Sequence, residues 1–200
     1  EIERGLVGSE MCIRDSYLDL MSNPESREVF IKRNKIIKSL RTNLESNGFL
    51  EVETPMMHPI PGGANARPFE THHNALDKKL YLRVAPELYL KRLLVGGYEK
   101  VFEINRNFRN EGISTIHNPE FTMLEFYEAY GDLQTTAKFI QKLIQDSILA
   151  VNDSLKITYD QKNINFEKDF EIRSLKELVK EELNVESVSY THLTLPTIRL

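Results

Sequence analysis

The sequence predicts an α+β fold built on a mainly antiparallel β-sheet that is flanked by helices. Segments of strand type follow one another through short turns, whereas segments of helical periodicity are longer and stand apart along the chain. Strands joined by short turns pair antiparallel, and helices grouped away from them pack against the sheet. With 200 residues, the chain is long enough for one domain or for a large part of one.

The first long helix is expected to begin after Asn23 and to end at residues 47–48. Asn23 can cap free backbone N–H groups, Pro24 suits the first turn, and Glu25 suits the positive end of the helix dipole. Apolar residues follow at helical spacing: Val29, Phe30, Ile36, Ile37, Leu40 and Leu44. An Asn-Gly pair after the last turn ends the helix, and residues 49–54 then alternate as a short strand.

The elements that follow alternate between strands and helices. We expect a loop at 59–64, a strand at 80–84, a helix at 86–94, a strand at 100–107, a strand or strand-to-helix region at 122–130, a helix at 133–151, a hairpin formed by 155–159 and 163–166, and a helix at 174–183. In the last helix, the spacing of Leu175, Leu178 and Val179 predicts that these side chains face inward.

The two ends of the chain are predicted to lie outside the fold. Residues 11–16 back-translate to a DNA sequence whose reverse complement encodes residues 188–192, and natural protein ends have no reason to be related in this way. The shared element resembles a transposon end used to build sequencing libraries, and the neighbouring residues resemble adapter translations. We therefore treat 1–16 and 188–200 as adapter-derived scars, and 17–187 as a partial domain.

Composition limits the kinds of function that need to be considered. The net charge is −4 and Cys12 is the only cysteine, so residues 17–187 offer no disulfide and no thiolate metal site. This composition fits a reducing, cytoplasmic compartment. The sequence shows no signal peptide and no apolar run long enough to span a bilayer, so a membrane partner is not expected.

The most informative stretch is Phe-Arg-Asn-Glu at 108–111, followed by His-Asn-Pro-Glu-Phe at 117–121. Arg109 can bind a phosphate through two parallel hydrogen bonds. His117 can reach a second phosphate, and the ring of Phe121 can lie flat against a purine. Each of these residues alone is more often a surface ion pair or a core side chain; together they indicate a nucleoside triphosphate site.

This stretch resembles the second signature motif of class II aminoacyl-tRNA synthetases, in the form found in the lysyl branch. The resemblance continues through residues 53–57, 66–69 and 85–91. It implies ATP-dependent activation of lysine to lysyl-adenylate, followed by transfer to tRNA(Lys). Arg109 would be the catalytic residue, because its position bridges the carboxylate and the α-phosphate. The resemblance also implies a set of ATP contacts: Arg109, Glu111, His117, Asn118 and Phe121.

The resemblance further assigns four residues to the lysine substrate. Glu87 would hold the α-ammonium group, with help from the loop backbone at Gly63. Glu125 and Tyr127 would line the pocket for the lysine side chain. Because alternate residues of a strand share a face, Glu125 and Tyr127 should project together, with Glu111 on a neighbouring strand.

The long helix and the short strand after it resemble the first motif of the family, which implies a homodimer. The third motif, the carboxylates that hold Mg²⁺ and the anticodon-binding domain have no counterpart in the sequence. We therefore expect no metal ligand within this chain and no useful activity from the chain as written. Two alternatives remain: a lysyl-transferring paralogue that modifies elongation factor P, and a non-catalytic synthetase-like binding fragment.

Overall fold

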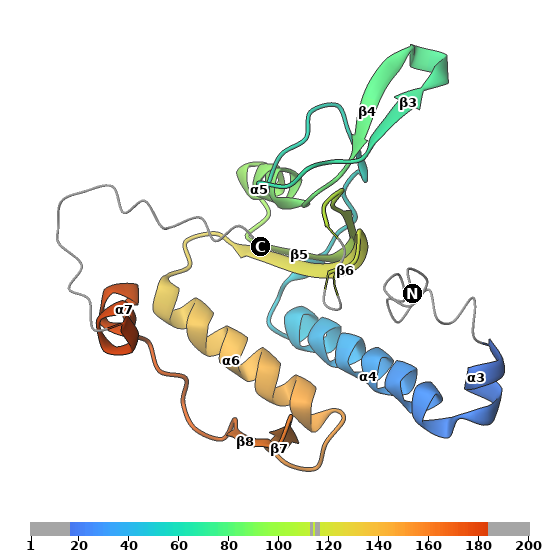
Figure 1. The fold of residues 1–200 in the computed structure, drawn as a ribbon. Helices are drawn as coiled ribbons and strands as arrows, with labels where there is room; N and C mark the ends of the chain where they lie inside the picture. Colours follow the sequence, from blue (N-terminus) through green and yellow to red (C-terminus); the bar gives the residue numbers. More distant parts are fainter. Residues whose placement is uncertain (1–16, 113, 115–116, 184–200) are drawn as a thin grey trace.

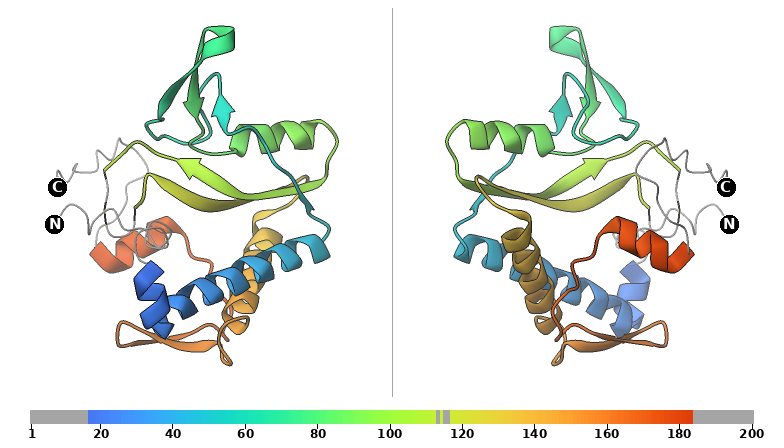
Figure 2. Two further views of the ribbon diagram at one scale, coloured as in Figure 1. Left: turned by 90° about the vertical axis from the view of Figure 1, so that its right-hand side faces the viewer. Right: turned by 90° about the vertical axis from the view of Figure 1, so that its left-hand side faces the viewer.

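The computed structural model describes residues 17–112, 114 and 117–183, and these residues form an α+β arrangement of layers (Figures 1 and 2). A central three-stranded sheet in the order β1-β5-β6 separates the helices into two groups. Helices α4 and α6 lie on one side of this sheet, and α5 lies on the other. The predicted α+β class with mainly antiparallel pairing is therefore confirmed.

Helix α4 spans Pro24–Ser46 and follows the short helix α3, Tyr17–Ser22. It begins as the sequence predicts, because the side-chain oxygen of Asn23 accepts a hydrogen bond from the backbone N–H of Glu25 at 3.0 Å. After its last residue the chain turns at Gly48, whose φ of +82° lies in the region that glycine adopts without strain.

The central sheet is formed by β1 (Leu50–Glu51), β5 (Lys100–Phe108) and β6 (Glu120–Glu128). β1 runs parallel to β5, and β5 pairs antiparallel with β6. The strand expected at 49–54 is regular over two residues only, although the Val52 N–H still donates to the Phe102 carbonyl at 2.9 Å. The ambiguous region at 122–130 is a strand.

A second sheet in the order β2-β4-β3 stands above the first one (Figure 1). Its strands are β2 (Met57–His58), β3 (Glu70–His73) and β4 (Lys78–Leu82), with the 3₁₀ turn η1 (Asn74–Leu76) between β3 and β4. The chain then enters α5 (Glu87–Val95), which is followed by two glycines at residues 96–97.

The chain ends with α6 (Leu133–Leu149), the hairpin of β7 (Lys156–Tyr159) and β8 (Lys162–Asn165), and α7 (Leu175–Leu183). These elements agree with the predicted ones in type. The prediction that Leu175 and Leu178 face inward is wrong, because these side chains are 77% and 38% exposed. Among the described residues, no helix or sheet packs closely over that face of α7. The helical spacing therefore correctly indicates an apolar stripe, but no other element covers it in this part of the chain.

The two faces of the β5–β6 ribbon differ in character. Even-numbered side chains such as Phe102 and Phe126 face α4 and α6, where they join the buried core. The Phe49 ring stacks on Phe139 at 5.4 Å between centroids and meets Phe126 edge-on at 5.5 Å. Odd-numbered side chains occupy the opposite face, and several of them are polar. This alternation separates the core from the site.

A buried ion pair connects the two sheets on the polar face. The Arg83 Nη1 atom lies 2.7 Å from Glu103 Oε1, and the two side chains are 0% and 1% exposed. Thr54, which follows β1, donates its hydroxyl to Glu103 Oε2 at 2.7 Å and accepts from Arg83 Nη1 at 3.0 Å. Arg83 also donates through Nε to the Arg106 carbonyl at 2.9 Å. The network therefore joins three segments that are distant in sequence.

Arg83→Met is expected to lower the free energy of unfolding by about 3–5 kcal/mol, because it leaves the Glu103 carboxylate buried without a counter-ion. The double change Arg83→Met/Glu103→Met should recover at least half of that loss. Urea unfolding of the chain measures both values. As a control, Lys32→Met removes an exposed pair with Glu28 and should change stability by less than about 1 kcal/mol. Equal losses in the single and double variants would contradict the assigned role of the pair.

Candidate functional site

A cavity of about 440 Å³ opens at the loop that joins β5 to β6. Its volume lies within the usual range of small-molecule sites, roughly 300–1,000 Å³. All five residues that the sequence predicts as ATP contacts line this cavity together with one glycine: Arg109, Glu111, Gly112, His117, Asn118 and Phe121. The structure therefore brings the predicted set together in one place.

Arg109 follows β5 directly and is fixed by both its backbone and its side chain. Its N–H donates to the Pro119 carbonyl at 2.8 Å, and its guanidinium carbon lies 5.2 Å from the centre of the Phe121 ring. Its Nε atom is buried and has no hydrogen-bond partner among the described residues. Because a buried donor without a partner is costly, this atom is available for an anionic ligand.

Glu111 and His117 lie in the connecting loop and are exposed. The prediction that Glu111 lies on a neighbouring strand is wrong, because β5 ends at Phe108 and the chain turns before Glu111. Glu111 Oε1 instead accepts from the backbone N–H of Arg67 at 3.3 Å. The Nδ1 atom of His117 lies 2.8 Å from the Ser114 hydroxyl. These contacts hold the loop beside the cavity.

Glu125 and Tyr127 share the polar face of β6, as their spacing predicts. The Tyr127 hydroxyl donates to Glu125 Oε2 at 3.0 Å. Burial raises the pKa of the Glu125 carboxyl, and the negative charge of Glu87 raises it further. Burial also raises the pKa of the Tyr127 hydroxyl, and the charge of Glu125 adds to this effect. Glu125 is thus a partly desolvated carboxylate, which gains free energy from a cation.

Glu87 and Gly63 approach the same region from α5 and from the loop before β3. Glu87 is the first residue of α5, and its influence on the pKa values of Glu125 and Tyr127 shows that the three side chains share one electrostatic environment. Gly63 has a φ of +92°, and a Cβ atom there would lie 3.2 Å from the Glu87 Cβ and 3.3 Å from the Ala85 Cβ. The backbone at Gly63 therefore lies directly against Glu87, and the four residues predicted to bind lysine gather on one side of the sheet.

The residues that support this cluster of carboxylates were not predicted from the sequence. In the β5–β6 register, Glu103 stands opposite Glu125, so both carboxylates lie on the same face. Arg83 neutralises Glu103 and opposes the rise in the pKa of Glu125. Asn105 donates to Glu103 Oε1 at 3.1 Å. The period-two pattern could have placed Glu103 and Asn105 on the polar face, but nothing in the sequence pairs Glu103 with Arg83.

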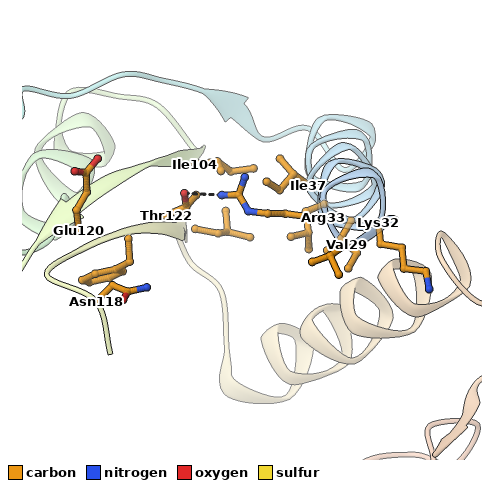
Figure 3. A pocket seen from close by; sticks show the side chains of 12 residues that line it. Val29, Lys32, Arg33, Ile37, Ile104, Asn118, Glu120 and Thr122 are labelled. Carbon is orange, nitrogen blue, oxygen red and sulfur yellow. Dashed lines mark hydrogen bonds between the residues drawn. The ribbon is translucent and has the colours of Figure 1, made fainter. Parts of the chain in front are cut away.

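A second cavity of about 590 Å³ lies between α4 and the sheet (Figure 3). Its walls are mainly apolar side chains such as Ile37 and Ile104, and Arg33 donates to the Thr122 hydroxyl across it at 3.0 Å. Asn118 and Phe121 line both cavities. These two residues therefore form part of the boundary between the two spaces.

Two features are absent from the part of the chain that the structure describes. In residues 17–112, 114 and 117–183, no three or more His, Cys, Asp or Glu side chains are grouped so that they could hold a metal ion. No helix in the same part of the chain is both long and apolar enough to cross a membrane.

Comparison with known proteins identifies what the chain resembles. The family described as tRNA synthetases class II (D, K and N) matches residues 8–193. The lysine–tRNA ligase of Syntrophomonas wolfei subsp. wolfei is 57% identical over 182 residues, which are 91% of this chain and 37% of that protein. The lysine–tRNA ligase of Carboxydothermus hydrogenoformans shows the same values. That of Chromobacterium violaceum is 56% identical over 176 residues, with 88% and 35% covered.

The chain thus spans a little over one third of the length of the curated relatives it matches. The family match extends beyond residues 17–187 on both sides, and the boundaries given above for the terminal scars remain a prediction.

Glu125→Gln is expected to raise the free energy of unfolding at pH 7. The raised pKa of Glu125 means that the folded chain binds the proton more tightly than the unfolded chain, so ionised Glu125 destabilises the fold. This penalty is present above the folded-state pKa and disappears as the pH falls through it. The gain in the free energy of unfolding should therefore become smaller as the pH is lowered toward about 4, the ordinary range of a carboxyl group. Urea unfolding at several pH values measures the difference.

Glu120→Gln provides the matched control, because Glu120 lies on the same strand with a side chain that is 56% exposed. It should show little of this pH-dependent gain. A loss of stability in the Glu125→Gln variant at pH 7 would contradict the assigned desolvation of Glu125.

Proposed function

The chain belongs to the class II tRNA synthetase family (D, K and N), and we propose that it is part of a lysine–tRNA ligase. The protein would couple lysine to ATP and transfer the lysyl group to tRNA(Lys) in the cytoplasm. The names of the relatives support this proposal. So does one structural observation: a cluster of carboxylates lies on the strand pair β5–β6, and the loop that joins these two strands lines a cavity with an arginine and a histidine.

The balance of charge in the carboxylate pocket suits a substrate with two ammonium groups. The negative charges of Glu87 and Glu103 both act on Glu125 there and raise the pKa of its carboxyl. Arg83 neutralises Glu103 inside the protein, whereas Glu125 has no such buried counter-ion among the described residues and Glu87 pairs only with the exposed side chain of Lys91. Lysine carries an α-ammonium and an ε-ammonium group, so each remaining carboxylate can accept one. The hydroxyl of Tyr127 holds Glu125 in place.

The neighbouring cavity has the opposite character and suits a nucleotide. The buried Nε donor of Arg109 has no partner in the part of the chain that the structure describes, and the guanidinium group of Arg109 lies against the ring of Phe121. Phe121 and Glu125 lie four residues apart on the same face of β6, which is about 13 Å along a strand. An ATP bound at Phe121 and a lysine bound at Glu125 would therefore meet between the two pockets, close to Arg109.

In the first step of the proposed reaction, a carboxylate oxygen of lysine attacks the α-phosphorus of ATP. A bond forms between this oxygen and the α-phosphorus, and the bond between the α-phosphorus and the departing pyrophosphate breaks. Arg109 would hold the attacking carboxylate and the α-phosphate in line and stabilise the negative charge that develops on the phosphate oxygens. In the second step, a hydroxyl of the terminal tRNA ribose attacks the lysyl carbonyl and releases AMP. Neither step requires a nucleophile from the protein.

The described residues do not fit a carboxylate-held Mg²⁺ site, because they contain no suitable group of acidic or histidine side chains. We therefore assign no magnesium ligand to them. We further propose that the protein acts as a homodimer that associates through α4 and the strand after it. Exposed apolar side chains on α4, including Val29 at 55% and Ile31 at 49%, support this part of the proposal.

The proposed function can be tested with a chimera in which residues 17–183 replace the matching segment of the Syntrophomonas wolfei lysine–tRNA ligase. The chimera should catalyse lysine-dependent exchange of pyrophosphate with ATP. Arg109→Ala in the chimera should lower kcat about 10²- to 10³-fold, because it removes a group that stabilises charge in the transition state.

Arg106→Ala is the matched control, because Arg106 lies on β5, three residues before Arg109, and pairs with Glu120 at 3.8 Å on the other face of the sheet. It should change kcat by less than tenfold. A folded chimera without lysine-dependent exchange, or one in which the two variants lose equal activity, would refute the proposed function.

A further inference from the structure

The α-ammonium site at Glu87 is already occupied by an ammonium group of the protein itself. The Lys91 Nζ atom lies 2.5 Å from Glu87 Oε1. We propose that Lys91 is an internal competitor for the substrate α-ammonium, and that it lowers the affinity of the site for ligands that carry this group. This inference rests on the proposed function, because it requires Glu87 to be the group that binds the α-ammonium of lysine.

The geometry makes Lys91 a counter-ion that can be displaced. Glu87 and Lys91 are four residues apart on α5, with the acid on the N-terminal side, which is the favourable order for such a pair. Their side chains are 31% and 55% exposed, so solvent weakens the interaction. The Lys91 side chain can therefore leave Glu87 for water without the loss that a buried ion pair would suffer.

The environment of Glu87 explains why a counter-ion is useful before the substrate binds. The charge of Glu87 raises the pKa values of both Glu125 and Tyr127, so these groups repel one another's ionised forms. An ammonium on Glu87 reduces this repulsion while the pocket is empty. When the substrate brings its own α-ammonium, two like charges would share one carboxylate, and the one on the flexible, exposed side chain moves away.

This competition acts only on ligands that carry an α-ammonium group. Such a ligand must displace Lys91 before it can bind Glu87, so Lys91 lowers the affinity of the site for it. A ligand whose single ammonium group binds at Glu125 leaves the pair of Lys91 and Glu87 intact. Lys91 acts through Glu87 without entering the reaction, and it is therefore a positioning residue.

The inference is tested by titrating the 200-residue chain with lysine in a calorimeter. Lys91→Met should lower the Kd for lysine about 1.5- to 2.5-fold, because an exposed helical ion pair no longer has to be broken. The Kd for 6-aminohexanoate should not change, because this analogue has no α-ammonium group to meet Glu87. Lys91→Arg, which keeps the competing cation, should restore the original Kd for lysine.

Lys142→Met is the matched control, because Lys142 forms the same type of pair with Asp146 on α6 at 2.7 Å and with similar exposure. It should leave both ligands unaffected. Lysine binding that is unchanged or weaker in Lys91→Met, or an equal gain for lysine and 6-aminohexanoate, would overturn this inference alone. Absence of saturable lysine binding by the unaltered chain would overturn this inference, whereas the proposed function is overturned by a folded chimera without lysine-dependent exchange.

Discussion

The buried ion pair between Arg83 and Glu103 is the constraint on which the arrangement of both pockets depends. It joins the end of β4 to the middle of β5, and Thr54 connects both charges to the segment after β1. The backbone reinforces this junction, because the Phe108 N–H donates to the Arg83 carbonyl at 2.9 Å. Arg109 is the next residue, so the network that holds the sheets together also fixes where the arginine enters the cavity. Two buried charges tolerate this position only because each satisfies the other.

The strand pair β5–β6 carries the site because its two faces perform different tasks. One face packs Phe102, Phe126 and their neighbours against α4 and α6, which supplies the burial that stabilises the ribbon. The other face points away from this core and carries carboxylates and a tyrosine, and Arg109 follows directly at the end of β5. Burial raises the pKa of Glu125, so the pocket holds a carboxylate whose charge is poorly solvated. An empty site of this kind destabilises the fold, and the same desolvation favours binding of a cation.

Features encoded in a few neighbouring residues could be predicted from the sequence. The cap at Asn23, the stop at Gly48 and the shared face of Glu125 and Tyr127 all depend on local spacing, and the structure shows each of them. Features that depend on contacts distant in sequence could not be predicted. The pairing of Arg83 with Glu103 is one example. The exposed stripe of α7 is another, because periodicity shows which residues share a face but not what that face meets.

The most direct test of this account is a crystal structure of the chimera with a non-hydrolysable lysyl-adenylate analogue. We predict that the adenine lies on Phe121, that the group replacing the α-phosphate contacts Arg109, and that the lysyl α- and ε-ammonium groups lie at Glu87 and Glu125 respectively. An analogue bound with its lysyl part away from Glu125, or with Arg109 turned away from the ligand, would contradict the assignment of the two pockets.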